Sequence, residues 1–195
     1  EKFLNKKKIW CAASTHKGEE IFCLKTHLVL KKVYNDMISI IIPRHISRSG
    51  EIKKLCNKFN LKSQILNDSQ LITEGKEVII INSFGELPSY FKNSKSVFIG
   101  KSILKKLKKV GGQNPIEAAK LDCKIYHGPY VSNFKEIYKL LKNYNISEEV
   151  NNEHELANKL LLDFKNPKII QNKNTKAINN LGEKILNDSI SEINK

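Results

Sequence analysis

The sequence lacks several features that would place it in a broad class at once. Its longest apolar run, residues 38–42, is strand-sized and far short of the roughly 20 residues that cross a bilayer. The chain begins at Glu1 without a charged and then apolar signal segment, and we interpret it as a piece of a longer protein. It has no internal repeat and no linker rich in Pro, Gly or Ser. With 40% hydrophobic residues among 195, it is nevertheless expected to form a real core.

Paired cysteines are missing as well. The four cysteines form no CxxC motif and, without a secretion signal, are expected to be buried, reduced thiols of a cytosolic protein: Cys11, Cys23, Cys56 and Cys123. Cys23 and His27 would share a helical face, as zinc ligands do, but no second pair accompanies them. We therefore predict neither a metal site nor a cofactor.

Arginine is scarce although the chain is strongly basic. Of the 34 basic residues only Arg44 and Arg48 are arginines, and the formal net charge is +14. The excess of lysine is interpreted as compositional drift, so most lysines are expected to lie on a solvated surface. Binding to an anionic membrane or to an acidic ligand is the alternative explanation of the charge. A nucleic-acid-binding module is a remote alternative, because residues 101–109 carry lysines without interleaved aromatics and no nucleic-acid motif is present. Lysine replaces a bidentate arginine poorly, which makes this arginine pair a candidate anion contact.

Two phosphate-binding motifs are incomplete. No GxGxxG follows the first predicted strand, which argues against a nicotinamide or flavin domain. Residues 100–102 (Gly-Lys-Ser) look like the end of a P-loop, but the glycine required five residues earlier is Lys95.

Apolar runs and helical patterns alternate along the chain. Strands are predicted at residues 8–13, 37–42, 63–66, 78–81, 96–99 and 124–126, and helices at 19–33, 50–59, 115–121, 133–143, 153–164 and 175–190, with a short one from Gly85 into Tyr90. This order predicts an α/β fold, a Rossmann-like parallel sheet with helices on both faces. Residues 1–164 are assigned to this domain and residues 165–195 to its peripheral helical tail. Ligands of such sheets bind beyond the carboxyl ends of the strands.

Three loops at predicted strand ends carry unusual residues. In residues 14–20, Thr15 can cap the next helix, whereas His16 and Gly18 suggest a polar contact and a close backbone approach. Pro43 ends a strand, so Arg44 is expected to project into the crevice as an anion contact. Residues 82–87 form a strand end, a turn and a helix start, where free amides can meet a ligand.

The fourth loop, residues 111–117 (Gly-Gly-Gln-Asn-Pro-Ile-Glu), is the most informative. Asn114 suits a helix N-cap, Pro115 the first helical position and Glu117 a capping box. Capping does not need two preceding glycines, so we favour a function in which a phosphate binds the helix amides and a carboxylate holds ribose hydroxyls.

In their order, these four segments and residues 128–129 with 133–134 resemble the C-terminal half of 3-deoxy-D-manno-octulosonic acid (Kdo) transferases of lipopolysaccharide synthesis. The resemblance implies a B-type glycosyltransferase whose C-terminal half binds the donor, CMP-Kdo, and which passes Kdo to a lipid A precursor without a metal. It implies donor contacts from Pro43, Arg44, Phe84, Gly85, Glu86, Asn114, Pro115, Ile116 and Glu117, and a cleft lined by Thr15, His16, Gly18 and Gly112.

The same resemblance also says what this chain is missing. The family's catalytic carboxylate and membrane anchor belong to its N-terminal half, so we expect no catalytic residue here and no transfer by this piece alone. The intact enzyme is expected at the cytoplasmic face of the inner membrane, with its own N-terminal domain and an anionic membrane surface as partners, and this piece itself to be soluble. Another nucleotide-sugar transferase or epimerase half is the alternative. Lys17, residues 82–83, Lys101 and Gln113 depart from the family's commonest residues.

Overall fold

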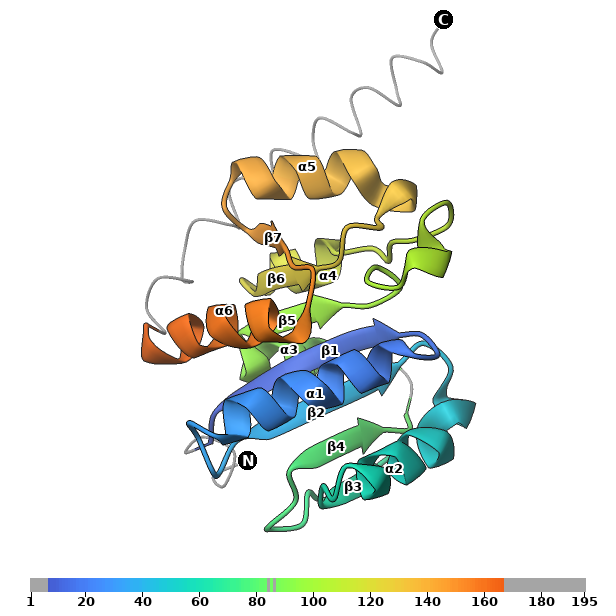
Figure 1. Ribbon diagram of the computed structural model, residues 1–195, viewed down its shortest axis with the longest axis vertical. Coiled ribbons are helices and arrows are strands. Elements are labelled where there is room, and N and C mark those ends of the chain that lie inside the picture. Colours follow the sequence, from blue (N-terminus) through green and yellow to red (C-terminus); the bar gives the residue numbers. More distant parts are fainter. Residues whose placement is uncertain (1–6, 84, 86, 167–195) are drawn as a thin grey trace, which may run out of the picture.

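A computed structural model describes residues 7–83, 85 and 87–166 of the chain. Its centre is a seven-stranded sheet in which every neighbouring pair is parallel, in the order β3-β4-β2-β1-β5-β6-β7 (Figure 1). The strands are β1 Ile9–Thr15, β2 Ile38–Pro43, β3 Ser63–Leu66, β4 Val78–Ile81, β5 Ser96–Ile99, β6 Lys124–His127 and β7 Ser147–Glu149. The predicted parallel α/β sheet is confirmed.

Helices cover both faces of the sheet. One face packs against α1 (Glu19–Lys31), α2 (Ser49–Lys58) and α6 (Glu153–Lys165), and the other against α3 (Leu87–Ser94), α4 (Ile116–Lys120) and α5 (Lys135–Asn143). Short 3-10 turns stand at Ile46–Arg48, Lys105–Leu107 and Ser132–Phe134. Figure 1 shows α1 and α6 in front of the sheet and α3 behind it.

The central strands are buried on both faces. Every residue of β2, β4 and β5 is buried, so their side chains supply both cores alternately: Ile40 and Ile79 face one cluster, Ile41 and Ile80 the other. That explains why these strands are continuous apolar runs instead of alternating patterns. All four cysteines are buried and free, as predicted.

Sequence and structure differ most at the sheet edge. β7 was not predicted, because its three residues, Ser147–Glu149, carry no apolar pattern; pairing with β6 and the buried neighbours Ile146 and Val150 hold it in place. The predicted tail helix at 175–190 lies outside the described residues. Within the described ranges, no helix is both long and apolar enough to pass through a membrane.

The strand order reverses between β1 and β5. From β1 the chain adds β2 beside it, forms the edge strand β3, inserts β4 between β3 and β2, and then returns to place β5 on the other side of β1. The usual ligand position in such sheets is the crevice beyond the carboxyl ends of the strands at this point.

Candidate functional site

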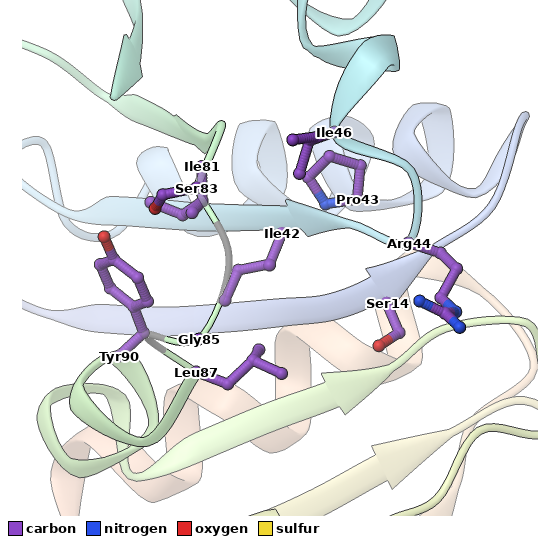
Figure 2. A pocket seen from close by; sticks show the side chains of 10 residues that line it. All are labelled: Ser14, Ile42, Pro43, Arg44, Ile46, Ile81, Ser83, Gly85, Leu87 and Tyr90. Carbon is purple, nitrogen blue, oxygen red and sulfur yellow. The ribbon is translucent and has the colours of Figure 1, made fainter. Parts of the chain in front are cut away.

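A small open pocket lies at the carboxyl edge, where β2 and β4 end and α3 begins. Its cavity volume is about 90 Å³, and it is lined by Ser14, Ile42, Pro43, Arg44, Ile46, Ile81, Ser83, Gly85, Leu87 and Tyr90. Figure 2 shows Arg44 and Ser14 at one end, Ser83 and Tyr90 at the other, and Ile42 and Leu87 between them. Three predicted donor residues, Pro43, Arg44 and Gly85, thus meet in one place.

Arg44 lines one end of this pocket and brings a positive charge to it. Its backbone NH donates to the Thr15 carbonyl at 3.0 Å, which ties the β2 end to the loop after β1. Its side chain is exposed and makes no ion pair with any described residue. A guanidinium held by its backbone and left unpaired can bind phosphate or carboxylate bidentately.

Arg48 is used differently. Its Nη1 and Nη2 donate to the two carboxylate oxygens of Glu20, at 2.6 and 3.1 Å, and its Nε donates to Glu51 at 3.2 Å. Glu20 is fully buried and also accepts from Thr15 Oγ1 and the Gly18 NH. The sequence argument treated the two arginines as a pair, but Arg48 is a structural counter-charge.

Thr15 and Gly18 both donate hydrogen bonds to this buried carboxylate. Thr15 was predicted to cap α1 or line the cleft; instead it is buried, and its hydroxyl donates to Glu20 at 2.9 Å. The N-cap is Gly18, which has no side-chain cap and a φ of 101°, a left-handed conformation that favours glycine. The capping prediction for Thr15 was therefore wrong.

Glu19 joins the two loops that flank the crevice. Its Oε2 accepts from the NH groups of His16 (2.9 Å) and Lys101 (2.6 Å), and its Oε1 from those of Ser102 (2.8 Å) and Ile103 (3.1 Å). The amides of residues 101–103, which overlap the P-loop-like segment, do form a nest, but a protein carboxylate fills it. From the sequence, Glu19 and Glu20 were assigned only to the helix dipole. Their structural role could have been suspected because two adjacent acids follow a glycine in a lysine-rich chain.

The glycine-rich loop before α4 is explained largely by packing. A Cβ on Gly111 would lie 2.1 Å from the Tyr130 carbonyl oxygen, and Gly112, with a φ of 99°, packs on Val131. The close approach that we attributed to a ligand is thus made by the protein's own backbone. Asn114 Oδ1 accepts from the Ile116 NH at 3.0 Å, but the N-cap of α4 is Pro115, one position later than predicted.

Glu117 is exposed and, among the described residues, neither closes a capping box nor forms an ion pair. It stays available for a ligand. Pro115 is buried and Ile116 half-buried, and α4 packs beside α3, the helix that lines the pocket through Leu87 and Tyr90. Phe84 and Glu86, two of the predicted donor contacts, lie outside the described residues.

His16 is half-buried at the end of β1. Its Nδ1 lies 3.1 Å from the Ser14 carbonyl oxygen, and its ring meets that of His45 edge-on with 6.2 Å between centroids. Burial lowers the pKa of His16, helped by the charges of Lys101 and His45 and opposed by the Ser14 carbonyl and Glu19. The part of the chain that the structure describes contains no cluster of three His, Cys, Asp or Glu side chains that could hold a metal ion.

Comparison with known proteins finds relatives in sequence and similar folds among solved structures. No protein-family model matches the chain. In sequence it is 31% identical over 160 residues to the 3-deoxy-D-manno-octulosonic acid transferase of Haemophilus influenzae, a match that covers 82% of this chain and 36% of that protein. In structure it is similar to the C-terminal CMP-Kdo binding domain of WaaA from Acinetobacter baumannii (TM-score 0.79, 23% identity, 91% of this chain and 90% of that one).

A second solved structure, the C-terminal domain of a group 1 glycosyltransferase (LpcC) from Francisella tularensis, is similar at a TM-score of 0.56 and 16% identity, over 90% of this chain and 85% of that one. The fold is therefore that of the C-terminal domain of B-type glycosyltransferases. Several Kdo transferases are similar to this chain over most of its length, and the chain spans well under half of theirs.

Proposed function

We propose that this chain is the donor-binding half of a glycosyltransferase that moves Kdo from CMP-Kdo to a lipid A precursor in lipopolysaccharide biosynthesis. The observation that carries the proposal is Arg44, which lies at the mouth of the β2–β4 pocket and forms no ion pair with a described residue, in a chain whose relatives are Kdo transferases. Pro43 and Gly85 line the same pocket, and Glu117 remains exposed and unpaired in the described part of the chain.

The chemistry divides between two halves. In the transfer, the bond from the sugar's anomeric carbon to the CMP phosphate oxygen breaks, and an acceptor hydroxyl oxygen bonds to that carbon while its proton passes to a general base. Arg44 would stabilise the charge that grows on the departing phosphate, the usual role of a fixed guanidinium. The general base would come from the N-terminal half, so this chain alone should bind the donor without transferring it.

The pocket's size supports a shared site. Small-molecule pockets typically enclose about 300–1,000 Å³, several times the 90 Å³ found here. The described residues thus offer one open wall, and we propose that the N-terminal domain supplies the other and that the donor binds without a metal. The intact enzyme would work at the cytoplasmic face of the inner membrane, where exposed lysines can add about 1 kcal/mol each near an anionic surface.

Calorimetric titration with CMP and UDP tests the donor class. We expect CMP to bind more tightly, equally with and without EDTA, and Arg44→Met to weaken CMP at least about tenfold because a charge-assisted contact is lost. Lys53→Met, which removes an exposed cation from α2, is the matched control and should leave the affinity unchanged. Tighter binding of UDP would instead favour the alternative, a half of another nucleotide-sugar enzyme.

A further inference from the structure

A row of nitrogen-bearing side chains runs across three neighbouring strands at the carboxyl edge. Arg44 and His45 follow β2, His16 follows β1 and Lys101 follows β5, and these strands are adjacent in the sheet. With strands about 4.8 Å apart, the row spans roughly 10 Å and crosses the point where the strand order reverses. The described pocket reaches only its Arg44 end.

Glu19 fixes the far end of this row. The NH groups of His16 and Lys101 donate to the same oxygen, Glu19 Oε2, although the two residues are 85 positions apart in the chain. Gly100 makes this approach possible, because a Cβ there would lie 2.6 Å from the Ser14 carbonyl oxygen. Lys101 also has a φ of 57°, a conformation rarely adopted by residues with a side chain.

Both side chains at this end keep a nitrogen for which the described residues provide no hydrogen-bond or ion-pair partner. Lys101 is half-buried and makes no ion pair or side-chain hydrogen bond with a described residue. Its Glu19 neighbour is already saturated by four backbone NH groups and lies beneath the surface. In His16, Nδ1 meets the Ser14 carbonyl, so Nε2 is the nitrogen left for a ligand.

We propose that His16 and Lys101 form a second anion subsite beside Arg44, which takes the carboxylate of a sugar acid while Arg44 takes the nucleotide phosphate. The proposal rests on the proposed function, since CMP-Kdo carries both groups. Neither anion can enter the amide nest of residues 101–103, because Glu19 occupies it. The ligand must therefore be held by side chains at this end.

Two ligands separate the two subsites. The 195-residue chain and its variants are titrated with CMP, which lacks the carboxylate, and with CMP-Kdo. Lys101→Met should weaken CMP-Kdo roughly tenfold and CMP less than twofold, whereas Arg44→Met weakens both. Lys101→Gly removes the same cation and also relieves the positive φ, so its CMP-Kdo loss cannot come from misfolding if its melting temperature is maintained. Lys108→Met, in the same loop and exposed, is the matched control with no effect.

His16 gives an independent readout. At pH 7 its ring is faced by Glu19 from α1, Lys101 from the β5 loop, His45 from the β2 loop and the Ser14 carbonyl. A carboxylate bound at Nε2 should draw a proton onto the ring, so CMP-Kdo binding takes up protons, measurable as a dependence of the heat on buffer ionisation enthalpy. His16→Gln should abolish most of that uptake and leave CMP binding unchanged.

The outcomes distinguish the two proposals. If the unmodified chain binds neither CMP nor CMP-Kdo, the proposed function fails and the subsite fails with it. If CMP binds but Lys101→Met changes both affinities by the same factor, or neither, the subsite alone is overturned.

Discussion

Arg44 and Arg48 lie four residues apart at the carboxyl edge of the sheet, and the fold uses them in opposite ways. Arg48 is mostly covered and bidentate to the fully buried Glu20, whereas Arg44 is exposed and unpaired in the described part of the chain. The contrast separates groups that build the crevice from groups that face it. Glu19, Glu20 and Arg48 hold the loops, and we propose that Arg44, His16, Lys101 and Glu117 face the ligand.

Removing each arginine should break this contrast most clearly. Arg48→Met leaves the Glu20 carboxylate buried without its counter-charge and should lower the free energy of unfolding by about 4 kcal/mol. Arg44→Met should change it by less than about 0.5 kcal/mol, as is usual for exposed positions. Urea unfolding followed by circular dichroism measures both. Equal losses in the two variants would contradict the division of roles.

Glu19 and Glu117 differ in the same way as the two arginines, since one is buried in the fold and the other is exposed. Glu19→Gln places an amide NH2 against two backbone NH donors, whichever way the side chain turns, and should cost about 3 kcal/mol. Glu117→Gln is the matched control, because Glu117 is exposed and should tolerate the change within about 0.5 kcal/mol. A stable Glu19→Gln variant would mean that the amide nest accepts other occupants.

The stability contributed by His27, in the core, should depend on pH more strongly than that contributed by His16, at the crevice. Burial lowers the pKa of His27 to about 4, with a further lowering by Lys31 and an opposing effect of Glu77, and its Nδ1 lies 2.8 Å from Ser39 Oγ. The unfolded chain, with a His pKa near 6.5, takes up the proton first as the pH falls. The stability contributed by neutral His27 is therefore full above pH 6.5 and decreases toward pH 4, by about 2 kcal/mol between pH 8 and pH 5.

A double variant, His27→Leu with Ser39→Ala, removes this titration and does not leave the Ser39 hydroxyl without its hydrogen-bond partner. Its unfolding free energy should fall about 2 kcal/mol less between pH 8 and pH 5 than that of the unmodified chain. His16→Gln, at the crevice, should flatten the same curve far less, because His16 is only half-buried. If His16→Gln had the larger effect, the core and crevice histidines would have been assigned the wrong way round.

The sequence predicts what local patterns determine. β3, β4 and β5 were predicted residue for residue, because short strand-like segments between helical patterns and turns leave few alternatives. Arg44 was singled out by the scarcity of arginine. What it missed depends on residues far apart in the chain. The Glu19 contacts link positions 16, 19 and 101–103, and Gly111 is required by the backbone at Tyr130. No pattern within one segment contains such contacts.

Asn114 combines a structural hydrogen bond with a predicted ligand contact, so its variants give the smallest expected effect. Its side-chain oxygen accepts from the Ile116 NH at the start of α4, yet the side chain is exposed at a predicted donor position. Asn114→Ala should lower stability by about 1 kcal/mol, and Asn114→Asp, which retains the acceptor, by less than about 0.5 kcal/mol. If the amide nitrogen also donates to the nucleotide, both variants lose about 1 kcal/mol of CMP affinity, or roughly fivefold, by calorimetry. Unchanged affinity in the stable Asp variant would assign Asn114 to the fold alone and leave Arg44 and Glu117 as the ligand-facing residues.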